Sequence, residues 1–90
     1  DAVLCSYDII AMNVLDELKK LGRRVPEDIA VAGFGDTDYY SPLFELTSVR
    51  QPMAEIGTRA VEFLLENRPA VRQEFLACEV ILRQSTGEER

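Results

Sequence analysis

Histidine is absent from this 90-residue chain. Without an imidazole group, the chain contains no Ser-His-Asp or Cys-His pair for nucleophilic catalysis. It also lacks the imidazole ligands that most often hold zinc in proteins. These two kinds of site are therefore excluded.

Cysteine is scarce, and the two that occur, Cys5 and Cys78, form no C-x-x-C motif. Each lies inside an apolar, strand-like run. We interpret both as small buried hydrophobic residues in a reducing cytosol. A disulfide between them is the alternative.

Long hydrophobic runs are missing as well. The longest apolar stretches fall far short of the ~20 residues that a membrane-spanning helix needs, and nothing resembles a signal peptide. The chain starts at Asp1, directly before a strand-like run, without an initiator methionine. We therefore expect it to be a fragment whose first residue carries no information about targeting.

The composition is that of a small globular domain, with 47% apolar and 29% charged residues. Acidic residues outnumber basic ones, which gives a net charge of −6. Phosphate backbones repel such a chain, so these residues are not expected to form a nucleic-acid surface.

Hydrophobic periodicity predicts an α/β protein with a parallel β-α-β core. Apolar runs predict strands over residues 2–6, 29–33 and 46–50, and alternation predicts another over 75–83. Helical spacing predicts helices over residues 8–21 and 52–67, with residues 34–45 as a long loop and 85–90 as a polar tail. A strand, a helix and a strand within about 33 residues make one right-handed crossover with parallel strands.

Finer details of the two helices are also predicted. The first helix is expected to bury a stripe of Ile10, Val14, Leu18 and Leu21, with Ala11 and Leu15 beside it. Ser6 or Asp8 is expected to cap its first turn, and Gly22 to end it. In the second helix, Gly57 costs roughly 1 kcal/mol relative to alanine, so we expect close packing to require it.

Three predicted strands end in polar residues, at 6–8, 35–38 and 50–51. The carboxyl ends of parallel strands meet at one edge of a sheet, so these groups are expected to form one rim. Hydroxyl, carboxylate, amide and guanidinium groups beside Tyr7, Phe34, Tyr39 and Tyr40 suit a small polar metabolite. The alternative is ordinary turn chemistry, with Asp8 serving only as a helix cap.

Weaker signals accompany this rim. Asp36 and Asp38 are candidates for acid/base chemistry or magnesium binding, but no second acidic cluster supports them. Gly33-Phe34-Gly35 lacks the third glycine and the following helix of a dinucleotide fingerprint. Met12 lies off the apolar stripe, and methionine and tyrosine are common at protein interfaces.

Four segments together resemble the C-terminal part of LacI/GalR-family transcriptional regulators. They are residues 1–12 (DAVLCSYDIIAM), 21–36 (LGRRVPEDIAVAGFGD), 46–65 (LTSVRQPMAEIGTRAVEFLL) and 82–87 (LRQSTG). The resemblance implies a fragment of a type I periplasmic-binding-protein-like domain, in which two lobes enclose an effector. Residues 1–50 would belong to the C-terminal lobe, 51–74 to a helix and linker of the other lobe, and 75–90 to a return strand and tail. The helix of the other lobe is expected to fold back or to bury its apolar stripe in another copy.

The resemblance also implies site residues, which the following list collects: Tyr7, Asp8, Gly35, Asp36 and Gln51 at the effector, and Met12, Leu15, Asp16, Tyr39 and Tyr40 at a dimer interface. The family often has Asn-Asp where this chain has Tyr7-Asp8. It often has an aspartate where this chain has Gly35. Two alternatives follow: Asp36 replaces that carboxylate from one residue along, or the effector is not a simple hexose but a sugar acid, a phosphate ester or another metabolite.

The function implied by the resemblance is that of a non-enzymatic effector sensor, without a cofactor, in a cytoplasmic homodimeric regulator. A sugar-like metabolite would modulate operator binding by an N-terminal DNA-binding domain that this chain does not contain. A periplasmic sugar-binding protein of a transporter is the runner-up, because it shares the fold. A third hypothesis is an enzyme or phospho-receiver that uses Asp8 and Asp36.

Overall fold

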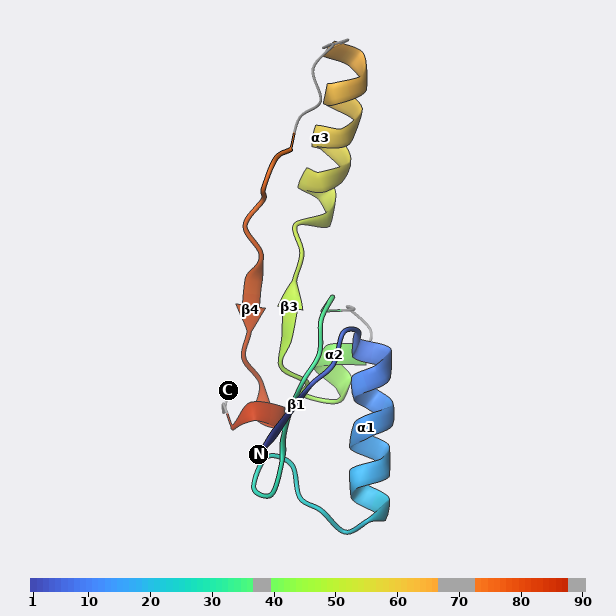
Figure 1. Cartoon of the computed structure of the whole chain (residues 1–90), viewed down its shortest axis with the longest axis vertical. Helices are drawn as coiled ribbons and strands as arrows, with labels where there is room; N and C mark the ends of the chain where they lie inside the picture. The colour runs from blue at the N-terminus through green and yellow to red at the C-terminus, as the bar shows by residue number, and fades with distance from the viewer. Residues whose placement is uncertain (37–39, 67–72, 88–90) are drawn as a thin grey trace.

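The structure is a computed structural model of the chain, and it describes residues 1–36, 40–66 and 73–87. Its elements, in chain order, are β1 (Ala2–Leu4), α1 (Asp8–Lys20), β2 (Ala30–Ala32), α2 (Tyr40–Leu43), β3 (Ser48–Arg50), α3 (Met53–Glu66), β4 (Glu79–Ile81) and the 3-10 helix η1 (Gln84–Thr86). The molecule is elongated, at 56 × 23 × 21 Å. A body of β1, α1, β2, α2 and η1 lies at one end and α3 at the other, joined by β3 and β4 (Figure 1).

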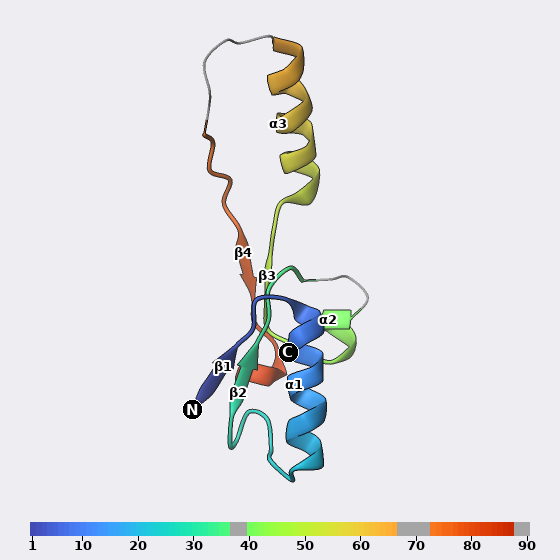
Figure 2. The ribbon, with the colours of Figure 1, turned by 45° about the vertical axis from the view of Figure 1, so that its right-hand side comes forward.

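The predicted parallel α/β core is confirmed. β1 pairs with β2 in parallel, with Val3 opposite Val31. Parallel bridges between Ala32 and Thr47, and between Gly35 and Arg50, place the third strand beside β2. α1 lies against the β1–β2 pair (Figure 2). β3 also pairs with β4, in antiparallel orientation, and we call these two strands (residues 48–50 and 79–81) the ribbon.

Helix α1 spans nearly the predicted range and buries most of the predicted face, which is centred on Ala11 and leaves out Ile10 and Leu21. Ala11 is fully buried, and Val14, Leu15 and Leu18 pack against the core. Ile10 and Leu21, which were expected in the buried stripe, are 46% and 66% exposed. Neighbouring helical positions are 100° apart, so the close approach of the small Ala11 to the sheet turns Ile10 aside.

The N-terminal end of α1 differs from the prediction, whereas its C-terminal end agrees with it. The N-cap is Tyr7, with extended backbone and no capping hydrogen bond from its side chain. Neither expected residue caps the helix, because Ser6 is exposed and the side chain of Asp8 is buried in the protein. Gly22 follows the helix with a φ of +74°, the left-handed conformation predicted to end it.

The core is small and extends to the end of the chain. Cys5, Ala11, Val31 and Leu46 form its buried cluster. Ser85 is buried as well, so the predicted polar tail begins inside the protein. Both cysteines are free, but Cys78 is exposed, which corrects the expectation that both are buried. Cys78 precedes an edge strand, where one side of the chain faces solvent.

Helix α3 extends away from the body, and none of its residues is buried (Figure 1). Of the two expectations for this helix, folding back onto the body is not observed, and burial of its apolar stripe in another copy stays a prediction. No atom lies within 4 Å of a Cβ added at Gly57, so the predicted close packing there is not observed either. Among the described residues, no helix combines the length and the apolar character needed to cross a membrane.

Candidate functional site

The polar segments that follow β1, β2 and β3 meet at one edge of the body, as predicted for parallel strands. The amide of Asp8 donates to the carbonyl of Phe34 at 3.2 Å, and that of Gly35 donates to the carbonyl of Val49 at 2.8 Å. Tyr7 is 66% exposed there, and Gln51 is half-buried at the end of the third strand. We call this edge, made of residues 6–8, 33–36 and 50–51, the rim. Asp38, which was predicted to belong to it, lies outside the described residues.

A hollow of about 420 Å³ opens at the rim, and its lining is mainly apolar. The residues that line it are Leu4, Cys5, Ser6 and Phe34. Leu4 is 79% exposed, whereas the Cys5 thiol is buried, and this burial raises the pKa of Cys5. The rim therefore combines an aromatic and aliphatic surface with a serine hydroxyl.

Asp8 belongs to the rim segment, but only 1% of its surface is exposed. Its Oδ2 accepts a short hydrogen bond from the hydroxyl of Ser41, and its Oδ1 accepts from the hydroxyl of Ser48 at 2.8 Å. Gly33 packs directly against this carboxylate, since an added Cβ would overlap Oδ1. Asp8 thus connects the first turn of α1 with α2 and β3, and its carboxylate is buried beneath the surface of the rim.

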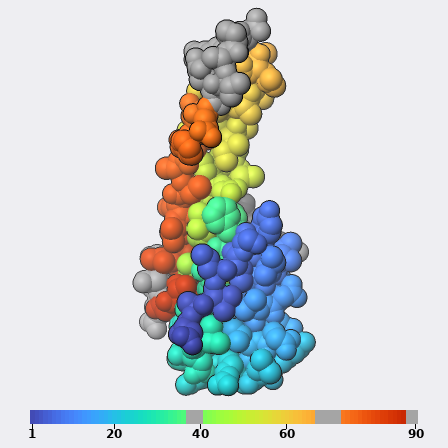
Figure 3. Space-filling model, in the orientation of Figure 1, coloured from blue at the N-terminus to red at the C-terminus, as the bar shows by residue number. Residues whose placement is uncertain are grey.

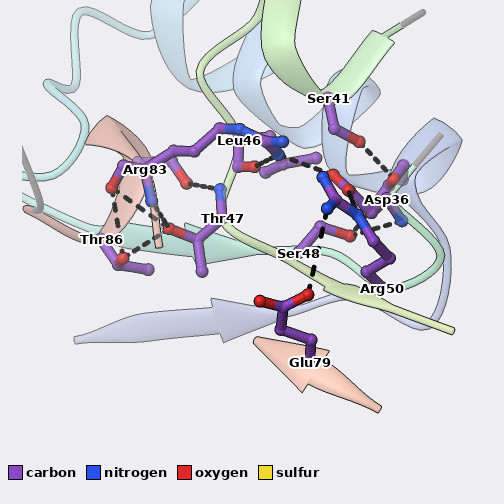
Figure 4. Close-up of polar contacts among 11 residues, drawn as sticks. Asp36, Ser41, Leu46, Thr47, Ser48, Arg50, Glu79, Arg83 and Thr86 are labelled. Carbon is purple, nitrogen blue, oxygen red and sulfur yellow. Dashed lines mark hydrogen bonds and ion pairs between the residues drawn. The ribbon is translucent and has the colours of Figure 1, made fainter. Parts of the chain in front are cut away.

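Asp36 is also buried, and it connects three segments of the chain (Figure 4). Its Oδ2 accepts from Nε of Arg50 at 2.7 Å, and its Oδ1 accepts from Nη1 of Arg83 at 2.8 Å. Its backbone amide donates to the hydroxyl of Ser48 at 2.8 Å. Its φ is +49°, a left-handed conformation that aspartate tolerates better than most residues.

Two opposing effects act on the pKa of Asp36. Burial of its carboxyl group alone raises the pKa, but the hydrogen bonds and positive charges of Arg83 and Arg50 outweigh this effect and lower it. The carboxylate is therefore ionised and engaged by two guanidinium groups. The described residues contain no cluster of three or more acidic or cysteine side chains that could hold a metal ion.

Gly35 occupies an open part of the rim. Its φ is +116°, and no atom lies within 4 Å of a Cβ added there. A side chain at this position would have space but a strained backbone. The chain therefore presents bare backbone at this point, immediately before Asp36.

Gln51 borders a second depression, a groove of about 520 Å³ between α3 and the chain returning toward the body. Residues 73–78 lie alongside α3 there (Figure 3). Arg59 of α3 joins the two sides through Glu74, whose carboxylate accepts from Nε at 2.7 Å and from Nη2 at 2.9 Å. Nη1 of Arg59 also donates to Glu62 of the same helix at 2.6 Å. These hydrogen bonds raise the pKa of Arg59, whose guanidinium also lies 5.2 Å from the ring centre of Phe63.

The residues predicted at a dimer interface have different environments. Met12 is half-exposed, and Asp16 is exposed and pairs with Lys20 at 3.3 Å. Leu15 packs partly against the core of its own chain. Tyr39 lies outside the described residues, and Tyr40 begins α2. Of this set, Met12 and Asp16 are thus available on the outer surface of α1.

Several residues that shape the site were not identified from the sequence. Ser41, Ser48 and Arg83 hold the two buried carboxylates. Ser85 donates to the carbonyl of Val31 at 2.6 Å and joins the chain end to β2. The available signal was Ser48 at the start of a strand expected inside the sheet, because a polar residue in a buried strand needs an internal partner.

Comparison with known proteins places this geometry in context. Residues 1–86 match the family described as the periplasmic binding protein-like domain. The HTH-type transcriptional repressor CytR of Escherichia coli (strain K12) is 35% identical over 92 residues, which cover 94% of this chain and 26% of that protein. The chain spans 20–26% of the length of the first curated relatives that it matches.

Solved structures agree with this comparison. The lac repressor dimer bound to operator and the anti-inducer ONPF matches with a TM-score of 0.85 and 27% identity, over 94% of this chain and 27% of that one. The transcriptional regulator CelR in complex with cellobiose matches with a TM-score of 0.84 and 33% identity, over 94% of this chain and 28% of that one.

Proposed function

The chain belongs to the periplasmic binding protein-like domain family, in the form found in LacI/GalR-type regulators, and from this premise we propose that it is the effector-sensing and dimerisation segment of a DNA-binding transcriptional regulator. Its relatives named above are transcriptional regulators, which disfavours a transporter's binding protein and fits a non-enzymatic role. DNA binding would lie in a separate N-terminal domain, and the regulator would act in the cytoplasm on its operator.

The observation that carries this proposal is the meeting of three parallel strand ends at the rim, beside the segment that leads to α3. Open α/β sheets bind ligands at the carboxyl ends of their strands. A ligand held there would contact the body on one side and the part of the protein that contains α3 on the other. Its binding would therefore favour one arrangement of the two parts over another.

A sugar or sugar derivative suits the exposed groups of the rim. The ring of Tyr7 offers a face for sugar carbons, and the amide of Gln51 offers both a donor and an acceptor for hydroxyl groups. The bare backbone at Gly35 leaves room for a substituent. The cellobiose complex of CelR supports this ligand class by similarity.

The two buried carboxylates take part differently. Asp8 and Asp36 have 1% and 5% of their surface exposed, and both are hydrogen-bonded inside the protein. We therefore assign them to shaping the rim from behind, and direct contact with the effector to Tyr7, Gly35 and Gln51.

Dimerisation would use the outer surface of α1. Met12 and Asp16 lie on that surface, and Tyr40 begins α2, which packs against α1. We assign Tyr39, the preceding residue in the sequence, to the same interface. In a dimer, a change in one effector domain would alter the spacing of the two DNA-binding domains. An effector that binds one arrangement of the dimer more tightly than the other would therefore change the affinity for the operator.

The test uses the full-length protein. Its preferred DNA is first selected from a random pool, and the complex is then titrated with cellobiose, gluconate and adenosine while DNA affinity is followed by fluorescence anisotropy. We expect one of these classes to change DNA affinity by roughly 5–150-fold. We expect Gln51→Ala to raise the concentration required by on the order of tenfold, the loss of one or two hydrogen bonds.

Gln84→Ala is the matched control, because it removes the same side chain from η1, a segment that packs against β2 and is not part of the rim. This variant should respond like the wild type. Failure of the protein to select any DNA sequence would contradict the regulator assignment. A full response by Gln51→Ala would contradict the site assignment.

A further inference from the structure

Two segments of the described chain join the body to α3. One is β3 with residues 51–52, and the other is residues 73–83, which include β4. They pair as the ribbon, with Ser48 opposite Ile81 and Arg50 opposite Glu79 (Figures 1 and 2). Because no residue of α3 is buried, the direction of the ribbon decides where α3 lies relative to the body.

Asp36 bonds to both of these segments. Arg50 is the last residue of β3, and Arg83 follows β4 by two residues. One carboxylate oxygen accepts from each arginine, at 2.7 and 2.8 Å (Figure 4). Nη1 of Arg83 also donates to the carbonyl of Leu46 at 2.7 Å, which fixes this guanidinium group to the segment that enters β3.

The environment makes these bonds strong. The side chain of Asp36 is 1% exposed and that of Arg83 is 14% exposed, whereas that of Arg50 is 49% exposed. Charge-assisted hydrogen bonds of this kind are roughly twice as strong as neutral ones, and burial limits screening by water and salt. The bond to Arg83 is therefore the firmer of the two. The pair of Arg50 with Glu79, at 4.0 Å on the exposed side, adds little.

The position of Asp36 in the sequence gives these bonds a consequence. It follows Gly35 directly, at the open part of the rim, so a displacement of the rim backbone moves the carboxylate. We propose that Asp36 is a positioning residue that ties the rim to both strands of the ribbon and transmits a displacement of the rim to α3. The part of this proposal that concerns ligands rests on the proposed function, whereas the tie to the ribbon does not.

Hydrogen exchange in the full-length protein tests the tie directly. Asp36→Asn keeps the size of the side chain but cannot accept two charge-assisted bonds. We expect amides in residues 46–50 and 79–83 to exchange on the order of tenfold faster than in the wild type, with residues 8–20 unchanged. Asp28→Asn is the matched control, because Asp28 pairs with Arg24 four residues away, at 3.3 Å and in solvent. It should affect only residues 24–29.

Two results would overturn the tie. One is unchanged protection of the ribbon in Asp36→Asn. The other is an equal acceleration in residues 8–20, which would show a loss of global stability only. If Asp36→Asn does not fold, Arg50→Gln removes the half-exposed bond to Asp36 together with the weak pair to Glu79. Because β3 and β4 are hydrogen-bonded to each other, this variant should accelerate exchange in both 46–50 and 79–83 with residues 8–20 unchanged, and unchanged protection of both strands would contradict the tie.

Transmission to DNA is tested with cellobiose, gluconate and adenosine on the DNA-bound full-length protein. If one of them changes DNA affinity in the wild type, Asp36→Asn should still bind that compound in calorimetry but should lose most of the change in DNA affinity. An equal change in both proteins would overturn transmission through Asp36. If none of the three acts on the wild type while the ribbon exchanges as expected, the tie holds and the proposed function fails for these ligand classes.

Discussion

Gly33→Ala tests the packing behind the rim most directly. A Cβ at residue 33 would lie 3.1 Å from Cδ2 of Leu46, 3.3 Å from Cα of Asp8 and well inside 3.0 Å of the Asp8 carboxylate, a separation that real Cβ atoms essentially never show. The favourable carbon contact distance is about 3.5–4.0 Å, so the carboxylate would have to move by about 1 Å. It cannot do so freely, because the hydroxyls of Ser41 and Ser48 hold it.

The magnitude follows from the two effects combined. Forcing an extra methyl group into a packed interior costs about 1–3 kcal/mol. Losing the hydrogen bond from Ser48 to the displaced oxygen adds about 1–3 kcal/mol, because a buried group is left without its partner. We therefore expect Gly33→Ala to lower the free energy of unfolding by about 4 kcal/mol, a large part of the roughly 5–15 kcal/mol of a typical domain.

Urea denaturation of the chain and of the longer protein measures this effect. Gly57→Ala is the control, because no atom lies within 4 Å of a Cβ added at that helical position. In the isolated chain it should stabilise α3 by up to about 1 kcal/mol, the difference in helix propensity. A Gly33→Ala variant within about 0.5 kcal/mol of the wild type, the range of neutral surface substitutions, would refute the packing argument.

Two further perturbations address the end of the chain and the buried ion pair. Ser85 donates to the carbonyl of Val31 and accepts from the amide of Thr47 at 2.8 Å. Ser85→Ala should therefore lower the free energy of unfolding by about 2–4 kcal/mol in urea denaturation, whereas Ser6→Ala, at an exposed position, should be neutral. Equal effects of the two variants would contradict a structural role for the C-terminal segment. The folded-state pKa of Asp36 is lowered, so its stabilisation is fully present above the ordinary aspartate pKa of about 3.9 and is lost as the pH falls through the folded-state value. Unfolding free energies between pH 6 and pH 2.5 should therefore fall less steeply for Asp36→Asn than for the wild type, and parallel curves would contradict this assignment.

The regular part of the fold was predictable because its signals are local and periodic. Apolar runs identified β1 and β2, and α1 was predicted to within one residue of its observed end. The burial of Ile10 was predicted wrongly, since periodicity defines a helix face only to within about one residue, or 100°. Which residues of that face are buried depends on how the helix packs against the sheet, and a local pattern does not show this packing.

Other elements escaped prediction for different reasons. Helix α2 has only four residues, with Pro42 inside it, and so has no period to detect. The predicted strand over residues 75–83 is observed only at Glu79–Ile81, because a single edge pairing with β3 supports it. Gly57 was predicted to pack closely, but a helix glycine shows only that space is available, not that it is filled.

The rim was predictable and its chemistry was not. The handedness of the β-α-β crossover brings the strand ends together, whatever residues occupy them. Whether an aspartate at a strand end faces the ligand or the interior depends on partners distant in sequence. Asp8 bonds to a serine 40 positions later, and Asp36 to an arginine 47 positions later. Such pairings leave no mark in the spacing of the chain.

Ser48 joins the two buried networks, which gives the rim one shared support. Its hydroxyl donates to Asp8 and accepts from the amide of Asp36, so a single oxygen satisfies both sides. The Asp8 network lies within the body and determines the shape of the rim, whereas the Asp36 network reaches the ribbon and determines its direction. A change in the rim that moves Ser48 therefore acts on both at once. For this reason we expect ligand affinity and the orientation of α3 to be separable at Asp36 but not at Ser48.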